Sequence, residues 1–110
     1  SGKVAAGLLL LFYAVECGLK HILCVRRRGF SGGEDDALFW SHDLGEIAKE
    51  LRLATVPLPL TFKLARGDEN GASKDCHLAW RYGVGIAPSD EAKLQAGLDA
   101  LATRIKQDIY

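Results

Sequence analysis

The sequence predicts an all-α fold, an antiparallel bundle of about four to five helices that forms a single domain over residues 1–110. Three observations predict it. Apolar residues recur at helical spacing, glycine or proline stands where the apolar segments end, and no segment alternates apolar and polar residues as a strand would. The 110 residues, 48% of them hydrophobic, suffice for one core and are too few for two ordinary domains.

The first predicted helix covers residues 3–28 and ends at Gly29. Its apolar start is shorter than a membrane span and leads into charged residues, so we expect a core helix and no membrane partner. A strip of small residues and one leucine follows helical spacing: Gly7, Leu11, Ala14 and Gly18. Such a strip lets another helix approach closely, either at an internal crossing or at a dimer seam.

A second helix is expected to begin at Ser41, whose hydroxyl is a favoured N-cap, with His42 in its first turn. Apolar residues at helical spacing would form its buried face and leave His42 on the opposite side. These residues are Leu44, Ile47, Ala48 and Leu51. Pro57 and Pro59 end the helix and make residues 56–60 extended.

The remaining chain is predicted to add short helices and a long final one. Residues 61–66 form a short helix and residues 67–74 a polar loop. Residues 75–82 form another short helix, which Gly83 ends in left-handed backbone. Ser89 caps the last helix. An apolar stripe on this helix faces the core: Leu94, Leu98, Leu101, Ile105 and Ile109.

Charge and cysteine content narrow the functional classes. Fourteen Lys and Arg balance fourteen Asp and Glu, so the whole molecule does not attract nucleic acid or anionic membranes, and any such binding must be local. Three cysteines cannot all pair within one chain, and Cys17 and Cys24 fall on one predicted helix. We therefore expect reduced thiols in a cytoplasmic protein.

The cysteines could also be ligands of a zinc ion. Cys17 and Cys24 are about 10 Å apart along the helix axis, too far to share one zinc ion. One of them with His21 could supply two ligands, and the other two would have to come from Cys76 and His77 or from outside the chain. Buried, unliganded cysteines are the commoner arrangement, so we predict no metal site and no cofactor.

Ionisable residues near the first two helices have a structural and a catalytic interpretation. Glu16 and Lys20 stand four residues apart in the orientation that favours an ion pair, which we interpret as structural. His42 is a candidate general base, because the positive end of a helix dipole favours neutral imidazole. The alternative for His42 is a local hydrogen bond beside the N-cap, next to Asp43 in the first turn.

Arginine and tyrosine side chains provide candidate contacts for RNA or a nucleotide. The guanidinium of Arg81 can bind phosphate bidentately, and the ring of Tyr82 can stack on a base. The structural alternative pairs Arg81 with Glu16 and places Tyr82 over the core. A second basic cluster stands where the first helix ends, a place that attracts cations for dipole reasons as well. It comprises Arg26, Arg27 and Arg28.

Three short motifs resemble those of the HEPN domains. They read Phe-Tyr-Ala-Val-Glu-Cys-Gly-Leu-Lys at residues 12–20, His-Asp-Leu at residues 42–44 and Trp-Arg-Tyr-Gly at residues 80–83. HEPN domains are small helical bundles, commonly dimeric, that occur with nucleotidyltransferases and in toxin–antitoxin pairs and other prokaryotic conflict systems. The resemblance covers most of the chain and implies a homodimer or a nucleotidyltransferase-like protein partner.

The resemblance also bears on catalysis. Ribonucleases of the HEPN family carry an arginine that is followed, after a short spacer, by a histidine. No arginine of this sequence has a histidine at that spacing. The resemblance therefore implies a non-catalytic binding or assembly module, with RNA or a nucleotide touching Arg81, Tyr82 and His42. The alternative is an atypical metal-independent ribonuclease that uses His42 with Arg81 or Tyr82.

Overall fold

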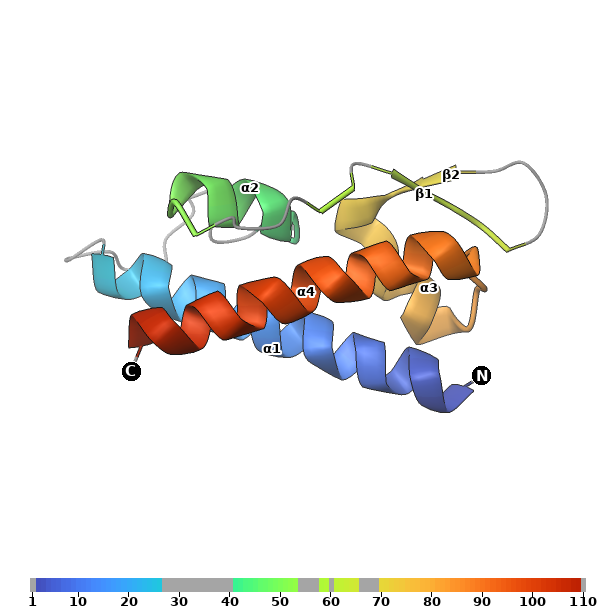
Figure 1. Ribbon diagram of the computed structural model, residues 1–110, viewed down its shortest axis with the longest axis horizontal. Helices are drawn as coiled ribbons and strands as arrows, with labels where there is room; N and C mark the ends of the chain where they lie inside the picture. The colour runs from blue at the N-terminus through green and yellow to red at the C-terminus, as the bar shows by residue number, and fades with distance from the viewer. Residues whose placement is uncertain (1, 27–40, 54–57, 60, 66–69, 110) are drawn as a thin grey trace.

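The computed structural model describes residues 2–26, 41–53, 58–59, 61–65 and 70–109. In these residues the chain forms four α-helices, one 3₁₀ helix and a two-stranded antiparallel sheet (Figure 1). The helices are α1 (Gly2–Arg26), α2 (Leu44–Glu50), the 3₁₀ helix η1 (Ser73–Asp75), α3 (Cys76–Tyr82) and α4 (Pro88–Ile109). The strands are β1 (Thr61–Lys63) and β2 (Asn70–Ala72). The fold is therefore mainly helical, as predicted, with a small sheet added.

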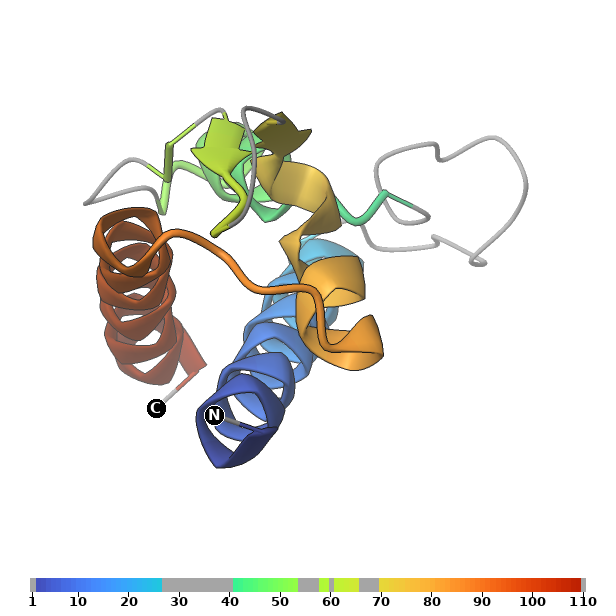
Figure 2. The ribbon, with the colours of Figure 1, turned by 90° about the vertical axis from the view of Figure 1, so that its right-hand side faces the viewer.

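The two long helices form the base of the molecule, and the shorter elements cover it. Figure 2 shows α2 and the hairpin formed by β1 and β2 above α1 and α4, with α3 beside α1. The core lies between these layers, because each long helix turns one apolar face towards it. From α1 the buried residues are Leu8, Phe12, Val15, Leu19, Ile22 and Leu23. From α4 they are Leu94, Leu98, Leu101 and Ile105, which confirms the predicted stripe; the side chain of Ile109 lies outside the described residues.

The long helices run in the same direction along the molecule (Figure 1). Their carboxyl ends meet, because Nη2 of Arg26 lies 3.2 Å from a carboxylate oxygen of Asp108. Arg26 also donates through Nη1 to the carbonyl oxygen of Leu51, at the carboxyl end of α2. The predicted antiparallel packing is therefore wrong for α1 with α2 and α4. The long connection between α1 and α4 lets α4 start at the end of the molecule where α1 starts.

The small-residue strip of α1 is divided between two environments. A Cβ atom on Gly18 would stand 2.8 Å from Cγ2 of Ile105, so this glycine lets α4 approach closely. Gly7 has no neighbour within 4 Å of an added Cβ, and Ala14 is exposed. The internal crossing is thus confirmed at Gly18. Leu11 is partly buried against the core, and Gly7 and Ala14 are exposed.

The start of α2 differs from the prediction. Its N-cap is Asp43, whose side chain accepts a hydrogen bond of 3.1 Å from the backbone N–H of Glu46. Ser41 instead accepts a hydrogen bond of 2.9 Å from the backbone N–H of Asp43 and so fixes the turn before the helix. The helix begins later than predicted, because the carboxylate competes successfully with the hydroxyl. The predicted buried face is confirmed at Leu44, Ile47, Ala48 and Leu51.

The predicted helix at residues 61–66 and the predicted loop at residues 67–74 are wrong where the structure describes them. Strands β1 and β2 pair there, with Phe62 opposite Gly71. Phe62 is buried, and a Cβ atom on Gly71 would stand 2.5 Å from its ring, so the glycine makes room for the phenyl group. This contact joins residues on two different strands, nine positions apart. The apolar periodicity within either short segment therefore does not predict it.

The last two helices follow the prediction more closely. Helix α3 ends at Gly83, whose φ of 73° is left-handed backbone that a glycine adopts without strain. Helix α4 begins at Pro88 and not after a Ser89 cap. Proline is favoured at the first helical position because its missing N–H would have no helical partner there.

Candidate functional site

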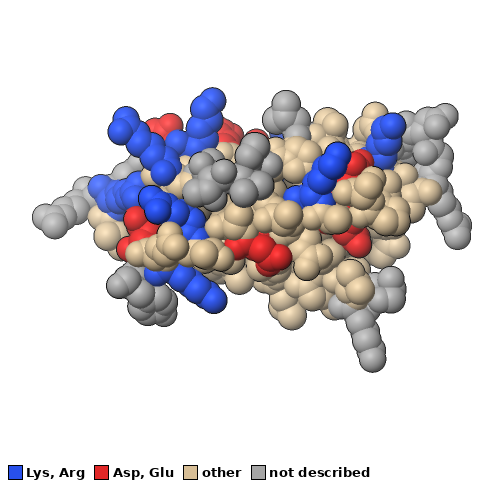
Figure 3. Space-filling view, in the orientation of Figure 1, with Lys and Arg blue, Asp and Glu red and all other residues tan. Residues whose placement is uncertain are grey.

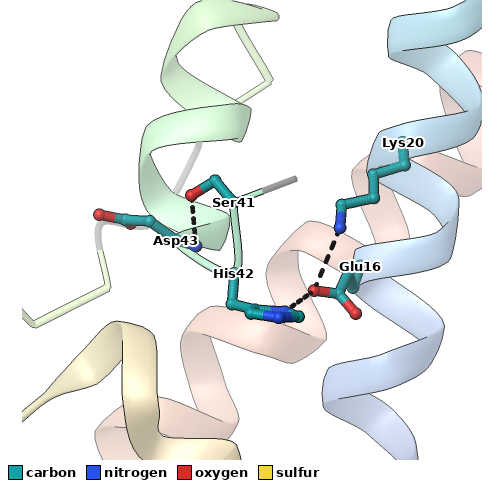
Figure 4. A network of polar contacts seen from close by, with 5 residues as sticks. All are labelled: Glu16, Lys20, Ser41, His42 and Asp43. Atoms are coloured by element: carbon teal, nitrogen blue, oxygen red, sulfur yellow. Dashed lines mark hydrogen bonds and ion pairs between the residues drawn. The ribbon is translucent and has the colours of Figure 1, made fainter. Parts of the chain in front are cut away.

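Ionisable and aromatic side chains gather where α1, α3 and the residues before α2 meet. Figure 4 shows the carboxylate of Glu16 between the imidazole of His42 and the ammonium of Lys20. Oε2 of Glu16 lies 2.5 Å from Nδ1 of His42 and 3.5 Å from Nζ of Lys20. The predicted Glu16–Lys20 ion pair is confirmed, and His42 joins it.

Local structure explains how His42 reaches this position. Ser41 and Asp43 bend the chain immediately before α2, and this bend turns the ring towards α1 (Figure 4). The prediction that His42 lies in the first helical turn, on the side away from the core, is therefore wrong. Its side chain is 54% exposed while the carboxylate of Glu16 is only 12% exposed, so one edge of the ring faces the protein and the other faces solvent.

The Glu16–His42 pair has a defined chemistry. With Nδ1 directed at the carboxylate, the other ring nitrogen, Nε2, is the one that remains for a ligand. A carboxylate in this position orients the ring and determines which nitrogen it presents, as in a catalytic dyad. The same contact is also a sound structural link between α1 and the start of α2.

His77 is a member of this cluster that the sequence analysis considered only as a metal ligand. It is buried on α3, its ring stacks on Phe12 with 4.7 Å between centroids, and the ring of His42 lies 5.0 Å away. Burial, followed by the charge of His42, lowers the pKa of His77, so the ring is neutral in the fold. Its Nδ1 atom has no hydrogen-bond partner among the described residues. The one signal in the sequence is a histidine among the apolar residues of α3.

Arg81 and Tyr82 lie at the exposed end of α3. The guanidinium carbon of Arg81 is 5.6 Å from the centroid of the Tyr82 ring, and Tyr82 is 70% exposed. Tyr82 therefore does not cover the core, and Glu16 is paired with Lys20 and His42 in place of Arg81. Arg81 follows His77 by one helical turn, so it stands on the side of α3 that carries the histidine.

The predicted basic cluster at the end of the first helix is only partly described. Arg26 bonds to Leu51 and Asp108, so its guanidinium joins the ends of three helices. Arg27 and Arg28 lie outside the described residues. Figure 3 shows Lys and Arg side chains near the end of the molecule where α4 finishes, with Asp and Glu side chains beside them. The described member of the cluster, Arg26, is thus paired within the protein, and phosphate binding by the cluster stays a prediction.

The three cysteines differ in how buried they are. Cys17 and Cys24 are exposed on α1, so the prediction of buried cysteines is wrong for these two, and it is confirmed for Cys76. All three are free thiols in the structure. Burial raises the pKa of the Cys76 thiol to about 12, so it stays protonated. Within the described ranges, no three His, Cys, Asp or Glu side chains are grouped so that they could hold a metal ion.

The outward face of α1 is the second feature with functional potential. Its exposed residues between positions 4 and 25 include no Lys, Arg, Asp or Glu, and Leu10 is 71% exposed. In Figure 3 the coloured residues along the lower right edge of the molecule, where the first half of this helix lies, are tan and therefore uncharged. The segment Val4–Arg26 is long and apolar enough to cross a membrane by length and composition alone, although a third of it is buried in the protein. Such a face is expected to contact another apolar surface.

No protein-family model, curated protein or solved structure matches this chain. The resemblance to HEPN domains therefore rests on the sequence motifs at residues 12–20, 42–44 and 80–83.

Proposed function

We propose that this chain is a non-catalytic, HEPN-like binding and assembly module that forms a homodimer through the exposed face of α1. One observation carries the proposal: an uncharged helical face, about 30 Å long at 1.5 Å per residue, is open to solvent. A monomeric soluble domain seldom exposes a continuous apolar surface of that length.

The spacing of the face favours another helix as its partner. Exposed residues alternate intervals of three and four positions, which is the pattern that keeps one seam of a helix against a neighbouring helix. They are Gly7, Leu10, Ala14, Cys17, His21 and Cys24. Small side chains in this seam, with glycine and alanine among them, allow close approach.

A second copy is the occupant that the charge of the chain favours. The formal net charge is zero, so two copies do not repel one another as strongly charged chains do. A two-fold dimer also places the same apolar face on both sides of the interface, which covers both copies at once. The resemblance to HEPN domains supports this assembly, because members of that family commonly dimerise.

The resemblance also supplies the setting that we propose. The module works in the cytoplasm of a prokaryote, beside a nucleotidyltransferase-like protein or in a toxin–antitoxin or defence system. RNA or a nucleotide would contact Arg81 and Tyr82, whose exposed guanidinium and ring offer a phosphate ligand and a stacking surface. His42 would complete this contact surface through Nε2.

Light scattering coupled to size exclusion tests the assembly. The reduced protein at micromolar concentration should elute with the mass of a dimer. A monomer that instead co-sediments with lipid vesicles would assign the α1 face to a membrane surface and overturn the proposal. A monomer that binds neither would also contradict it.

A second candidate function has its own observation. The Glu16–His42 hydrogen bond has the arrangement of an acid–base dyad, and it favours a metal-independent ribonuclease in which Arg81 binds the phosphate. Incubation with single-stranded RNA in the presence of EDTA tests this alternative. The binding-module proposal expects no sustained cleavage. Cleavage that disappears in a folded His42→Ala variant would establish the ribonuclease in its place.

A further inference from the structure

The exposed face of α1 carries three side chains that bind soft divalent metals. Cys17 and Cys24 are free thiols open to solvent, and His21 between them is exposed as well. His21 follows Cys17 by four residues, so the two side chains are neighbours on one side of the helix, about one turn apart. We infer that Cys17 and His21 from two copies of the chain form a four-coordinate Zn²⁺ site at the two-fold axis of the dimer, an inference that rests on the proposed α1 homodimer.

One chain cannot supply four ligands from the residues that the structure describes. Cys17 and Cys24 are about 10 Å apart along the axis, whereas Zn–S bonds are about 2.3 Å long. Cys76 is buried on α3, and the ring of His77 is stacked against Phe12, so neither side chain reaches the outer face of α1. A single copy thus offers one thiolate and one imidazole to a given metal ion.

A second copy of the chain supplies the two missing zinc ligands. Structural zinc sites in proteins are almost always tetrahedral with four Cys or His ligands, and a two-fold axis doubles whatever one copy presents. Whether the two α1 helices run parallel or antiparallel, an axis near residues 17–21 brings together two thiolates and two imidazoles. Such a Cys₂His₂ set is one of the common structural zinc environments.

The charge balance suits an apolar interface. Each thiol loses its proton to solvent when it binds, so one zinc ion displaces two protons and the two thiolates cancel its charge. The complex is neutral and sits in a face without Lys, Arg, Asp or Glu. Cys17 is favoured over Cys24 because Ala14, one turn earlier, leaves room for the partner helix.

Metal titration of the reduced full chain tests the site. Zn²⁺ should bind at about one ion per two chains, and Co²⁺ in its place should give the strong visible absorption of a tetrahedral thiolate complex. Cys17→Ser and His21→Ala should each abolish that absorption. Cys24→Ser removes a thiol from the same helix face and is the matched control, which should bind Co²⁺ as the parent does.

Parallel sedimentation in EDTA and in Zn²⁺ separates this inference from the proposed function. A dimer that binds no Zn²⁺, or one whose Co²⁺ absorption survives in Cys17→Ser, overturns the zinc site and leaves the assembly standing. A dimer held only by a Cys17 disulfide under oxidising conditions also overturns it. A protein that is monomeric with and without Zn²⁺ contradicts the α1 homodimer itself.

Discussion

The Nδ1 atom of His42 lies 2.5 Å from Oε2 of Glu16, and this contact joins the start of α2 to the middle of α1. Because Glu16 is nearly buried, the contact satisfies a carboxylate that would otherwise have lost its hydration without compensation. The side chain of His42 is still 54% exposed, so part of the imidazole stays open to solvent. It therefore connects the stability of the fold to the candidate site.

Replacing Glu16 with Ala should harm folding more than binding. The variant removes the acceptor shared by His42 and Lys20, and we expect a loss of about 1–3 kcal/mol in the free energy of unfolding. Glu16→Gln keeps an oxygen acceptor and should lose less. Thermal denaturation at one protein concentration measures both variants, and a Glu16→Ala protein that melts like the parent would contradict the structural role of the contact.

His77 should make the protein less stable in mild acid. Its folded pKa is lowered, whereas a histidine in the unfolded chain titrates near about 6.5. As the pH falls below that value, the unfolded state takes up a proton that the folded state resists, so stability decreases. One such proton contributes at most about 1.4 kcal/mol per pH unit.

His77→Phe isolates this contribution. The phenyl ring can keep the stack on Phe12 but cannot titrate, so the loss of stability between about pH 7 and about pH 5.5 should be smaller than in the parent. Urea denaturation at the two pH values measures the difference. An unchanged pH dependence would show that His77 does not resist protonation, and would redirect attention to His42 and Glu16.

Gly18→Ala should reveal how closely α4 packs on α1. An added methyl group would meet Cγ2 of Ile105 at 2.8 Å, and such overpacking costs about 1–3 kcal/mol, which offsets or exceeds the roughly 1 kcal/mol gained in helix propensity. In an Ile105→Ala background the obstacle is gone, so the same change should stabilise. Gly45→Ala, whose Cβ would be 3.5 Å from its nearest neighbour, should be insensitive to Ile105→Ala. A Gly18→Ala variant that is stabilised in both backgrounds would contradict this packing.

The sequence predicts those features of the fold that depend on neighbouring residues within one helix. Repeated apolar spacing locates the buried face of α4 from Leu94 to Ile105, and a glycine after Tyr82 locates the end of α3. The hairpin of β1 and β2 could not be predicted from the sequence, because the pairing of Phe62 with Gly71 depends on a contact between two strands. The parallel orientation of α1 and α4 could not be predicted either. It depends on the path of the long connection between them, and the apolar periodicity of a helix says nothing about that path.

In the candidate site, likewise, the contact within one helix was predictable and the contacts between elements were not. The Glu16–Lys20 pair follows from spacing on one helix and is confirmed. The approach of His42 depends on whether Ser41 or Asp43 caps α2, a competition that residue preferences alone do not decide. The stack of His77 on Phe12 joins α1 to α3 and could be found only after the helices were placed.

Any binding of RNA should be weak and should depend on Arg81. The balanced charge of the chain gives little non-specific affinity, so a local phosphate contact would carry most of it. Arg81→Ala should weaken binding of single-stranded RNA and lower the slope of log affinity against log salt by about 1. Fluorescence anisotropy over a salt series measures this. Binding unaffected by Arg81→Ala would move the contact elsewhere, first to Arg26, Arg27 and Arg28.

The α1 homodimer is tested most directly by sedimentation velocity of a charge variant on its exposed face. Leu10→Glu places a carboxylate in the seam, where burial without a partner is costly, and the protein should become monomeric while its circular dichroism stays unchanged. Leu78→Glu, at an exposed leucine of α3, is the matched control and should remain dimeric like the parent. A parent that sediments as a monomer, or a Leu10→Glu variant that stays dimeric, would contradict the proposal that α1 binds a second copy.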